Sequence, residues 1–330
     1  MGLTIHLGAY GYGNLGDELC LTEAMKAFPA EEAHAHSIAP NWTMRCVPSL
    51  TGCFTGIEEM FALKPARVVF GGGMVGTPEI FREHLPLLDR AAREGIEIHL
   101  HNLGVARLTG DTAWRTEAAL RAIAQAATFT VRDYLSFEMA VEADIGRLPG
   151  ITFFPEADMP ADFTLADAVL PRGRKLLGVS IIPTPPMRAA LRQEAARIRE
   201  LLVEFTGHAV VPVVSTMHVT NQHETDMAGC IAFIREFLPR SEVAAPMLLD
   251  RAHWHAQLTP ARLKGIIGRC DALLTQRKHN AIHAIGAGVR VIGLHPLVDD
   301  SMRRTFIALS HRLPPGSRCV GLRSGAEHAA

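Results

Sequence analysis

The stretch Asp271-Ala-Leu-Leu-Thr-Gln-Arg-Lys-His-Asn-Ala-Ile-His-Ala-Ile-Gly-Ala-Gly288 decides the fold class of this chain. Its apolar start, Ala272 to Leu274, predicts a short strand, and the run of small residues behind it predicts a helix. Val289 to Leu294 then predicts a second strand. Strands that alternate with helices form parallel sheets, so the stretch predicts an α/β fold.

Two cations and a histidine, Arg277, Lys278 and His279, stand where the first of these strands gives way to the helix. Ligands of open α/β sheets bind beyond the carboxyl ends of the strands. The backbone amides at the start of a helix also favour anions. The three residues therefore predict an anion-binding site.

The length of 330 residues, with 48% hydrophobic residues, is enough for two cores. The basic Pro/Gly run Leu170 to Lys175 predicts a boundary, which gives domains at residues 1–170 and 171–330. Each half alternates strands with helices. We therefore expect two Rossmann-like domains that face one another across a cleft.

The amino-terminal half is predicted to contain strands at Leu3–Leu7, Arg67–Phe70, Glu97–Leu100, Phe129–Val131 and Ile151–Phe154, and helices at Glu18–Phe28, Pro78–Glu94 and Thr112–Ala126. The other half adds strands at Leu176–Ile181 and Ala209–Val214, and helices at Met187–Phe205, Glu224–Phe237 and Pro260–Cys270.

Charge and cysteine content exclude several classes of protein. Lys and Arg number 33 and Asp and Glu 34, which argues against a general nucleic-acid binder. Six scattered cysteines without a C-x-x-C pair indicate reduced thiols in the cytoplasm. No apolar run approaches the length of a membrane span. His279 and His283 have the spacing of a zinc helix, but without the H-E-x-x-H pattern we predict no metal.

A glycine loop, Gly11 to Gly16, follows the first strand and matches G-x-G-x-x-G through Gly11, Gly13 and Gly16. A dinucleotide site is one interpretation. Asp17 and Glu18 count against it, because carboxylates in the first helical turn complement the helix dipole and repel a pyrophosphate. Asn14 and Asp17 either cap the helix or contact a ligand, and we favour ligand contact.

A second loop, Gly71-Gly72-Gly73, follows the strand that starts at Arg67. Consecutive glycines after a strand let a ligand approach the backbone, or accommodate helix packing. His101 follows the strand Glu97–Leu100, and we expect it to point at the cleft.

In combination these pieces resemble the polysaccharide pyruvyl transferase family, over roughly residues 5 to 294. The resemblance rests on five segments in order: G-Y-G-N-x-G-D-E at Gly11–Glu18, the glycines 71–73, V-R-D-x-x-S at Val131–Ser136, the loosened A-D-P-A-F-like segment Ala157–Phe163, and R-x-H-x-x-x-x-A-x-x-x-G at Arg277–Gly288.

The resemblance implies a glycosyltransferase-B type of fold and the transfer of pyruvate from phosphoenolpyruvate to two hydroxyls of a sugar, which gives a cyclic ketal and phosphate. It implies phosphoenolpyruvate contacts at Arg132, Arg277 and His279. Phosphoenolpyruvate is then the donor substrate, no cofactor is expected, and the partner is a sugar acceptor that could be lipid-linked. The expected location is the cytoplasm, with peripheral attachment at the inner membrane face as an option.

Phosphoenolpyruvate carries a carboxylate and a phosphate, and arginine pairs bidentately with either. Arg132 and Arg277 end strands of different halves, so closure of the cleft could bring both onto one ligand; a salt bridge with Asp133 is the alternative for Arg132. Histidine titrates near neutral pH, and His279 is the first candidate for proton transfer, with Asp17 as a base toward the sugar. Lys278, His101, Asn14, Gly13 and the glycines 71–73 complete the predicted substrate contacts.

Two departures from the family pattern leave alternatives open. Lys278 stands where the family has an apolar residue, and His295 to Asp300 lacks the basic residue expected after the last strand. A glycosyltransferase that uses a nucleotide sugar is one alternative. A non-catalytic carbohydrate-binding subunit is the other.

Overall fold

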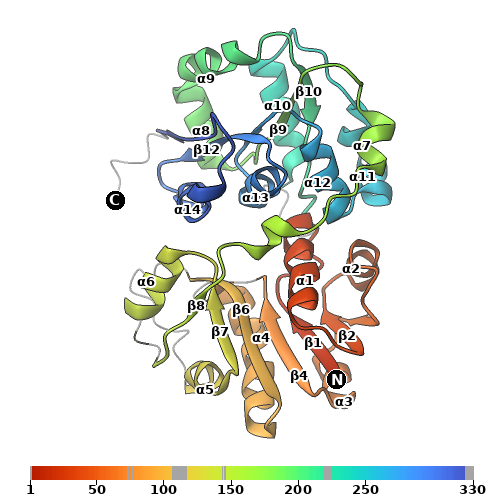
Figure 1. The fold of residues 1–330 in the computed structure, drawn as a ribbon, viewed down its shortest axis with the longest axis vertical. Coiled ribbons are helices and arrows are strands. Elements are labelled where there is room, and N and C mark those ends of the chain that lie inside the picture. The colour runs from red at the N-terminus through yellow and green to blue at the C-terminus, as the bar shows by residue number, and fades with distance from the viewer. Residues whose placement is uncertain are drawn as a thin grey trace. The chain divides into compact units, whose positions relative to one another are not determined.

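The computed structural model divides the chain into two compact units, an amino-terminal unit, Met1–Glu156, and a carboxy-terminal unit, Ala157–Ala330 (Figure 1). It describes residues 2–72, 74–75, 78–105, 117–142, 144, 146–218 and 225–323, with backbone only for 74–75 and 78–83. No helix in these ranges is long and apolar enough to cross a bilayer.

The boundary lies at residue 156, not at the predicted residue 170. The segment from Ala157 to Asp162 belongs to the carboxy-terminal unit because the buried Lys264 ammonium donates to the carbonyls of Ala157 and Met159. The amide of Asp162 donates to the carbonyl of Ala261 over 2.9 Å. The basic run behind residue 170 is an exposed surface turn, so its composition marks a loop and no domain boundary.

The amino-terminal unit is built on a parallel sheet with strand order β3-β2-β1-β4-β6-β7-β8, and β5 pairs with β6. Its elements are β1 Leu3–Leu7, α1 Leu15–Ala27, β2 Glu32–His36, α2 Pro40–Cys46, β3 Gly52–Phe54, α3 Ile57–Ala62, β4 Arg67–Gly71, β5 Met74–Val75, α4 Pro78–Glu94, β6 Glu97–Val105, α5 Glu117–Gln125, β7 Thr128–Val131, α6 Tyr134–Glu142 and β8 Gly150–Ile151.

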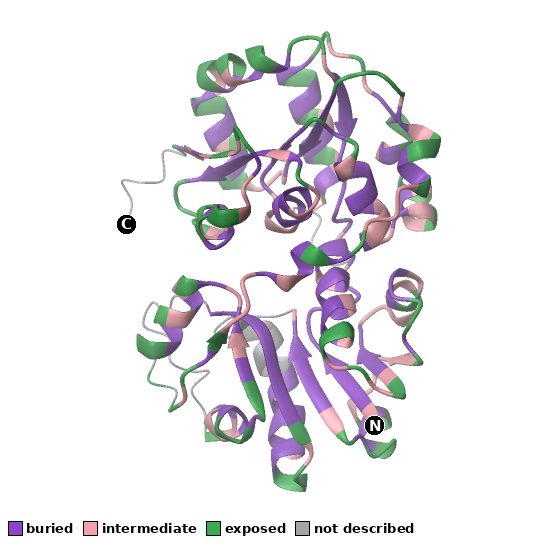
Figure 2. Ribbon diagram, viewed as in Figure 1, coloured by how far each residue is buried: buried purple, intermediate pink, exposed green. Residues whose placement is uncertain are grey.

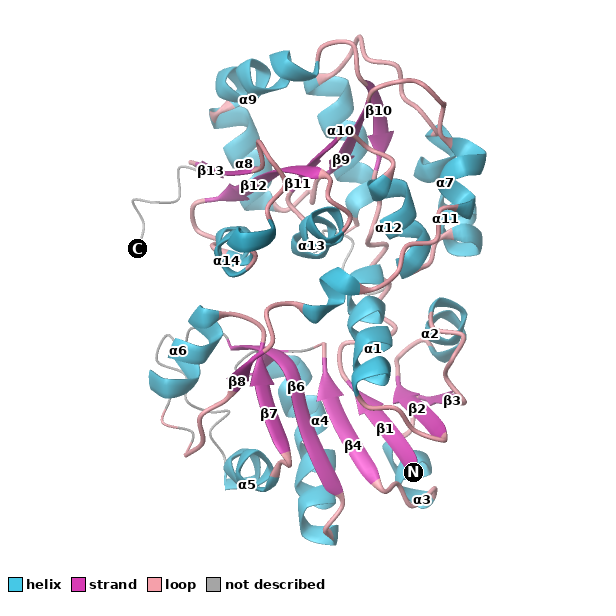
Figure 3. Ribbon diagram, in the orientation of Figure 1, coloured by secondary structure: helices cyan, strands magenta, loops and turns pink. Residues whose placement is uncertain are grey.

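The carboxy-terminal unit has a second parallel sheet, with strand order β10-β9-β11-β12-β13 (Figure 3). Its elements are α7 Thr164–Val169, β9 Leu176–Ser180, α8 Pro185–Gln193, α9 Ala195–Leu202, β10 Ala209–Pro212, α10 Asp226–Phe237, α11 Arg251–Gln257, α12 Pro260–Gly268, β11 Ala272–Thr275, α13 Lys278–Gly286, β12 Arg290–Pro296, α14 Ser301–Ala308 and β13 Arg318–Leu322.

Apolar strands form the centre of each unit (Figure 2). Ile5, Leu7 and Phe70 are fully buried in the first core, and Leu177 and Leu274 in the second. Each such side chain contributes about 1.5–3 kcal/mol by leaving water. Because the strands are covered on both faces, they read as continuous apolar runs.

Most predicted elements are present, several with ends shifted by a few residues, and three of the differences have identifiable reasons. The predicted helix Met187–Phe205 breaks at Glu194, which has φ −101° and ψ 21° and whose buried carboxylate accepts from Nε of the exposed Arg323 over 2.7 Å. The predicted strand Ile151–Phe154 ends at Ile151, because Phe153 and Phe154 have positive φ. Strand β6 runs on to Val105, with a register shift between Leu100 and Leu103. Residues 112–116 of the predicted helix Thr112–Ala126 lie outside the described residues.

Candidate functional site

The glycine loop leads from the end of β1 into α1. Gly11 and Gly13 have φ of +87° and +84°, a region that favours glycine. The side chain of Asn14 caps α1, since its Oδ1 accepts from the amide of Gly16 over 3.0 Å. Asn14 and Asp17 are half-buried on this loop and first turn, while Gly13 is buried. Asn14 therefore caps α1, as one of the two interpretations of the sequence predicted. Its side chain also lies at the carboxyl end of β1, where ligands of such sheets bind.

Glu18, one of the two carboxylic acids that the sequence predicted in the first turn of α1, is fully buried, unlike its neighbour Asp17. Its Oε1 accepts from the amide of Gly11 over 2.7 Å and from the Thr43 hydroxyl over 3.3 Å. Burial raises the pKa of Glu18 to about 8. The Thr43 hydroxyl also bonds Ser37 over 2.8 Å, so Glu18 ties the glycine loop to the segment after β2.

The second glycine loop is packed against α1. The carbonyl of Gly71 accepts from the Tyr10 hydroxyl over 2.9 Å. Gly72 has φ +64°, and a Cβ there would lie 2.9 Å from Cβ of Cys20. Packing against α1 is therefore a sufficient reason for a glycine at position 72, with or without a ligand at the end of this strand. Gly73 lies outside the described residues.

His101 does not end a strand, and the expectation that it points into a cleft is wrong. It lies within β6, and its Nε2 is 2.8 Å from Oε2 of Glu23 on α1. Both side chains are 10% exposed, and the ring of Phe28 packs edge-on against the imidazole. Because β6 continues past Leu100, His101 lies against helix α1, where its side chain packs on Glu23 and Phe28.

Arg132 directly follows β7, and its amide donates to the carbonyl of Leu103 over 3.0 Å. Its side chain is 14% exposed, and its Nε lies 3.8 Å from Oδ2 of Asp133. The guanidinium lies over Gly104, where a Cβ would sit 2.4 Å from Nη2. The absence of a side chain at Gly104 thus leaves the space that the Arg132 guanidinium occupies.

The rest of the V-R-D-x-x-S segment is structural. Oδ1 of Asp133 accepts from the amide of Ser136 over 2.7 Å, which caps α6. The Ser136 hydroxyl accepts from the amide of Val105 over 3.1 Å. These bonds fix the loop that carries Arg132.

Helix α13 begins with the three residues singled out by the sequence. Arg277 is its N-cap, and Lys278 and His279 are in its first turn. All three are half-buried. Cations at the positive end of a helix dipole are unfavourable by themselves, whereas an anion there is stabilised. This edge of the carboxy-terminal sheet therefore suits an anionic ligand.

Arg277 is held by Asp226, which the sequence analysis did not single out. The Nε of Arg277 donates to Oδ1 of Asp226 over 2.7 Å, and Asp226 is fully buried. Burial raises the pKa of Asp226, while Arg277 and Ser215 act in the opposite direction. The two residues are 51 positions apart, so no local pattern joins them.

His283 and His295 have packing and turn roles. His283 is fully buried, and burial lowers its pKa to about 3. His295 is the last residue but one of β12, and its Nδ1 lies 2.8 Å from the carbonyl of Asp299. The departure at residues 295–300 is therefore a closed turn that leads into α14.

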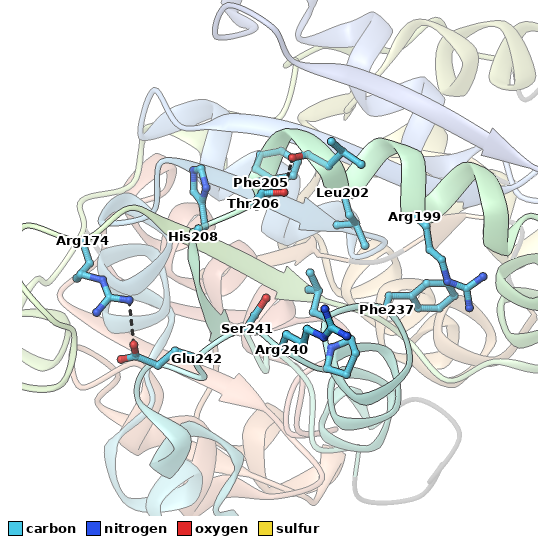
Figure 4. Close-up of a pocket in the computed structure, with 14 residues that line it drawn as sticks. Arg174, Arg199, Leu202, Phe205, Thr206, His208, Phe237, Arg240, Ser241 and Glu242 are labelled. Atoms are coloured by element: carbon cyan, nitrogen blue, oxygen red, sulfur yellow. Dashed lines mark hydrogen bonds and ion pairs between the residues drawn. The ribbon is translucent and has the colours of Figure 1, made fainter.

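A pocket of about 580 Å³ lies at the opposite, amino-terminal ends of β9 and β10 (Figure 4). Arg174 pairs there with Glu242 over 2.9 Å, and the Arg199 guanidinium lies 5.5 Å from the Phe237 ring centre. Ligands of parallel sheets bind at the other strand ends, so we do not assign the site to this pocket.

Comparisons with known proteins concern the fold. No family model and no curated protein matches the sequence. The UDP-GlcNAc 2-epimerase from Neisseria meningitidis, bound to UDP-GlcNAc, is similar with a TM-score of 0.56 at 10% identity, over 98% of this chain and 89% of that chain. The UDP-GlcNAc 2-epimerase from Methanocaldococcus jannaschii gives 0.53 at 11% identity, over 97% and 89%. The chain thus has the two-domain α/β architecture of the glycosyltransferase-B type.

Proposed function

We propose that this chain transfers a pyruvyl group from phosphoenolpyruvate to a sugar diol of a polysaccharide or its precursor. The observation that carries the proposal is the start of α13, where Arg277, Lys278 and His279 gather at the positive end of a helix dipole. A small dianion is the ligand that such a site would hold best.

The motif residues of the resemblance support the proposal by their places in the fold. Gly13 and Asn14 follow β1, Gly71 ends β4, Arg132 follows β7 and Arg277 follows β11. All four strands belong to parallel sheets, and their carboxyl ends are where such folds bind ligands.

The reaction assigns a task to each group. The methylene carbon of phosphoenolpyruvate gains a proton, which makes the central carbon electrophilic, and His279 is proposed to deliver it. Both sugar hydroxyls then bond to that carbon as the C–O bond to phosphate breaks. One hydroxyl proton balances the new methyl group and the other leaves on phosphate. Asp17 is proposed to accept a proton from a hydroxyl, and Arg132 and Arg277 to hold the carboxylate and phosphate.

A second candidate is an enzyme that acts on a nucleotide sugar, such as a glycosyltransferase. The fold favours it, because the solved structures that share the architecture include UDP-GlcNAc 2-epimerases, one of them with UDP-GlcNAc bound. In that case the anion held at α13 would be a diphosphate.

Phosphate release from phosphoenolpyruvate, measured with lipid-linked and nucleotide-linked glycans as acceptors, tests the first candidate. Thermal stabilisation by phosphoenolpyruvate, but not by UDP, is the matching binding result. Stabilisation by UDP alone, without phosphate release, would transfer the assignment to the nucleotide-sugar candidate.

Variants assign the activity to the site. His279→Ala and Arg277→Ala are each expected to lower the rate at least a hundredfold. His311→Ala, an exposed histidine of the same unit, is the control and should leave the rate unchanged. Pathway activity that survives both site variants would instead indicate a non-catalytic subunit.

A further inference from the structure

A buried chain of hydrogen bonds joins three strand ends of the carboxy-terminal unit. Nδ2 of Asn280, in the first turn of α13, donates to the Ser180 hydroxyl at the end of β9 over 2.8 Å and to the Ser215 hydroxyl after β10 over 3.2 Å. The Ser215 hydroxyl donates to Oδ2 of Asp226 over 2.8 Å. Oδ1 of Asp226 accepts from Nε of Arg277, which follows β11.

Asp226 accepts several hydrogen bonds at its carboxyl group. Besides the Ser215 hydroxyl, its Oδ2 accepts from the amides of Ser215 and Thr216 over 3.0 and 3.1 Å. With Arg277 on Oδ1, four donors converge on one carboxyl group. Burial raises the pKa of Asp226, and the bonds from Arg277 and Ser215 act against that rise. A carboxyl group with these donors is a well-placed acceptor for a guanidinium.

The bond to Nε has a geometric consequence for Arg277. The guanidinium is planar, so a fixed acceptor at Nε sets the direction of the whole group. The side chain of Arg277 is 12% exposed and that of Asp226 is fully buried, so water competes little for this bond. A preset guanidinium loses less freedom when it binds an anion.

We propose that Asp226 is a positioning residue, which acts through Arg277 and is itself supported by Ser215 and Asn280. It does not touch the ligand, and it fixes the guanidinium in the orientation that receives one anionic group. The inference rests on the proposed function only in taking Arg277 as a ligand contact, and it holds for a phosphate of either donor class.

The first test measures the bond without any ligand. In ¹H–¹⁵N spectra of the full chain, the Nε–H of Arg277, assigned by its loss in Arg277→Gln, should exchange slowly with water. Asp226→Asn should speed this exchange at least tenfold, and the milder Ser215→Ala should speed it less. Unchanged exchange in Asp226→Asn would overturn the inference.

The second test is a double-mutant cycle on anion affinity, with phosphoenolpyruvate, UDP and inorganic phosphate as probes. Asp226→Asn should weaken binding of the anion that binds wild type at least tenfold, and by less than twofold when Arg277 is already Gln. Asp167→Asn is the control, because it removes an exposed ion pair with Arg269 in the same unit. It should leave affinity unchanged.

The outcomes separate the two proposals. If UDP binds, phosphoenolpyruvate does not, and the cycle behaves as stated, positioning by Asp226 stands and pyruvyl transfer falls. If phosphoenolpyruvate binds and Asp226→Asn weakens it equally with and without Arg277, Asp226 has only a general structural role. Should Asp226→Asn fail to fold, Ser215→Ala carries both tests, and no change in either readout would reject the inference.

Discussion

The carboxyl ends of the two sheets are built by different means. In the amino-terminal unit the edge is shaped by backbone, with Gly11 and Gly13 at positive φ and the buried Glu18 bonded to the amide of Gly11. In the carboxy-terminal unit it is shaped by side chains, with Arg277 bonded to the buried Asp226.

The difference lies in the partners of the buried acid. Burial raises the pKa of Glu18 to about 8, so this acid is neutral at neutral pH. Burial raises the pKa of Asp226 as well, but its carboxyl group meets a guanidinium and three further donors, and Arg277 and Ser215 act against that rise. The strand ends of the amino-terminal unit thus present a fixed backbone surface to a ligand. Those of the carboxy-terminal unit present a guanidinium in a fixed direction.

The largest effect is expected from breaking the charged edge. Arg277→Ala leaves Asp226 buried without its counter-charge, which should lower the free energy of unfolding by about 3–5 kcal/mol. Arg174→Ala removes the exposed pair with Glu242 in the same unit and should cost less than about 1 kcal/mol. Urea unfolding of both variants measures the contrast, and equal losses would contradict it.

The next effect is expected at the strand ends of the amino-terminal unit, where the backbone of the glycine loop shapes the site. A Cβ at position 11 would lie 2.2 Å from Oγ of Ser37, and φ there is +87°. Gly11→Ala should therefore cost about 2–4 kcal/mol through overlap and strain. At Gly95 φ is also positive, but a Cβ added there would meet none of the described residues within 4 Å. Gly95→Ala should cost about 1 kcal/mol, and a similar loss at both sites would show that strain alone acts.

The raised pKa of Glu18 predicts that the stability of the protein depends on pH. Glu18 keeps its proton in the folded state up to about pH 8, whereas an unfolded glutamic acid loses it near pH 4.5. The folded state then binds more protons, so stability should fall as pH rises from about 4.5 to 8, by at most about 1.4 kcal/mol per unit. Glu18→Gln should remove this component, as measured by urea midpoints across that range. An unchanged slope would show that Glu18 is charged when folded.

A further effect is expected in acid, and it is shared by both units. Burial lowers the pKa of His6 and of His283 to about 3. Both stay neutral when folded while the unfolded chain gains protons, so stability should fall as pH drops from about 6.5 towards 3. His283→Leu should flatten this fall relative to wild type. An identical acid profile in the variant would contradict the assignment of His283 to the neutral core.

The class of fold and the strand ends that carry polar residues could be predicted from the sequence. Strand Leu3–Leu7 and helix Pro78–Glu94 have the predicted bounds, because apolar periodicity is a local property that burial of one face dictates. Arg132 and Arg277 follow predicted strands for the same reason.

The partners that those residues contact depend on tertiary packing and could not be predicted from the sequence. It buried His101 against Glu23, turned Glu18 inward beneath Gly11, and joined Asp226 to Arg277. The bonds of His101 and of Asp226 join residues 78 and 51 positions apart, which no helical or strand period connects. The bond between Glu18 and Gly11 spans seven positions, across the loop that precedes α1. Such contacts are set by how strands and helices stack, and the free energy of a buried polar group depends on the partner it finds there.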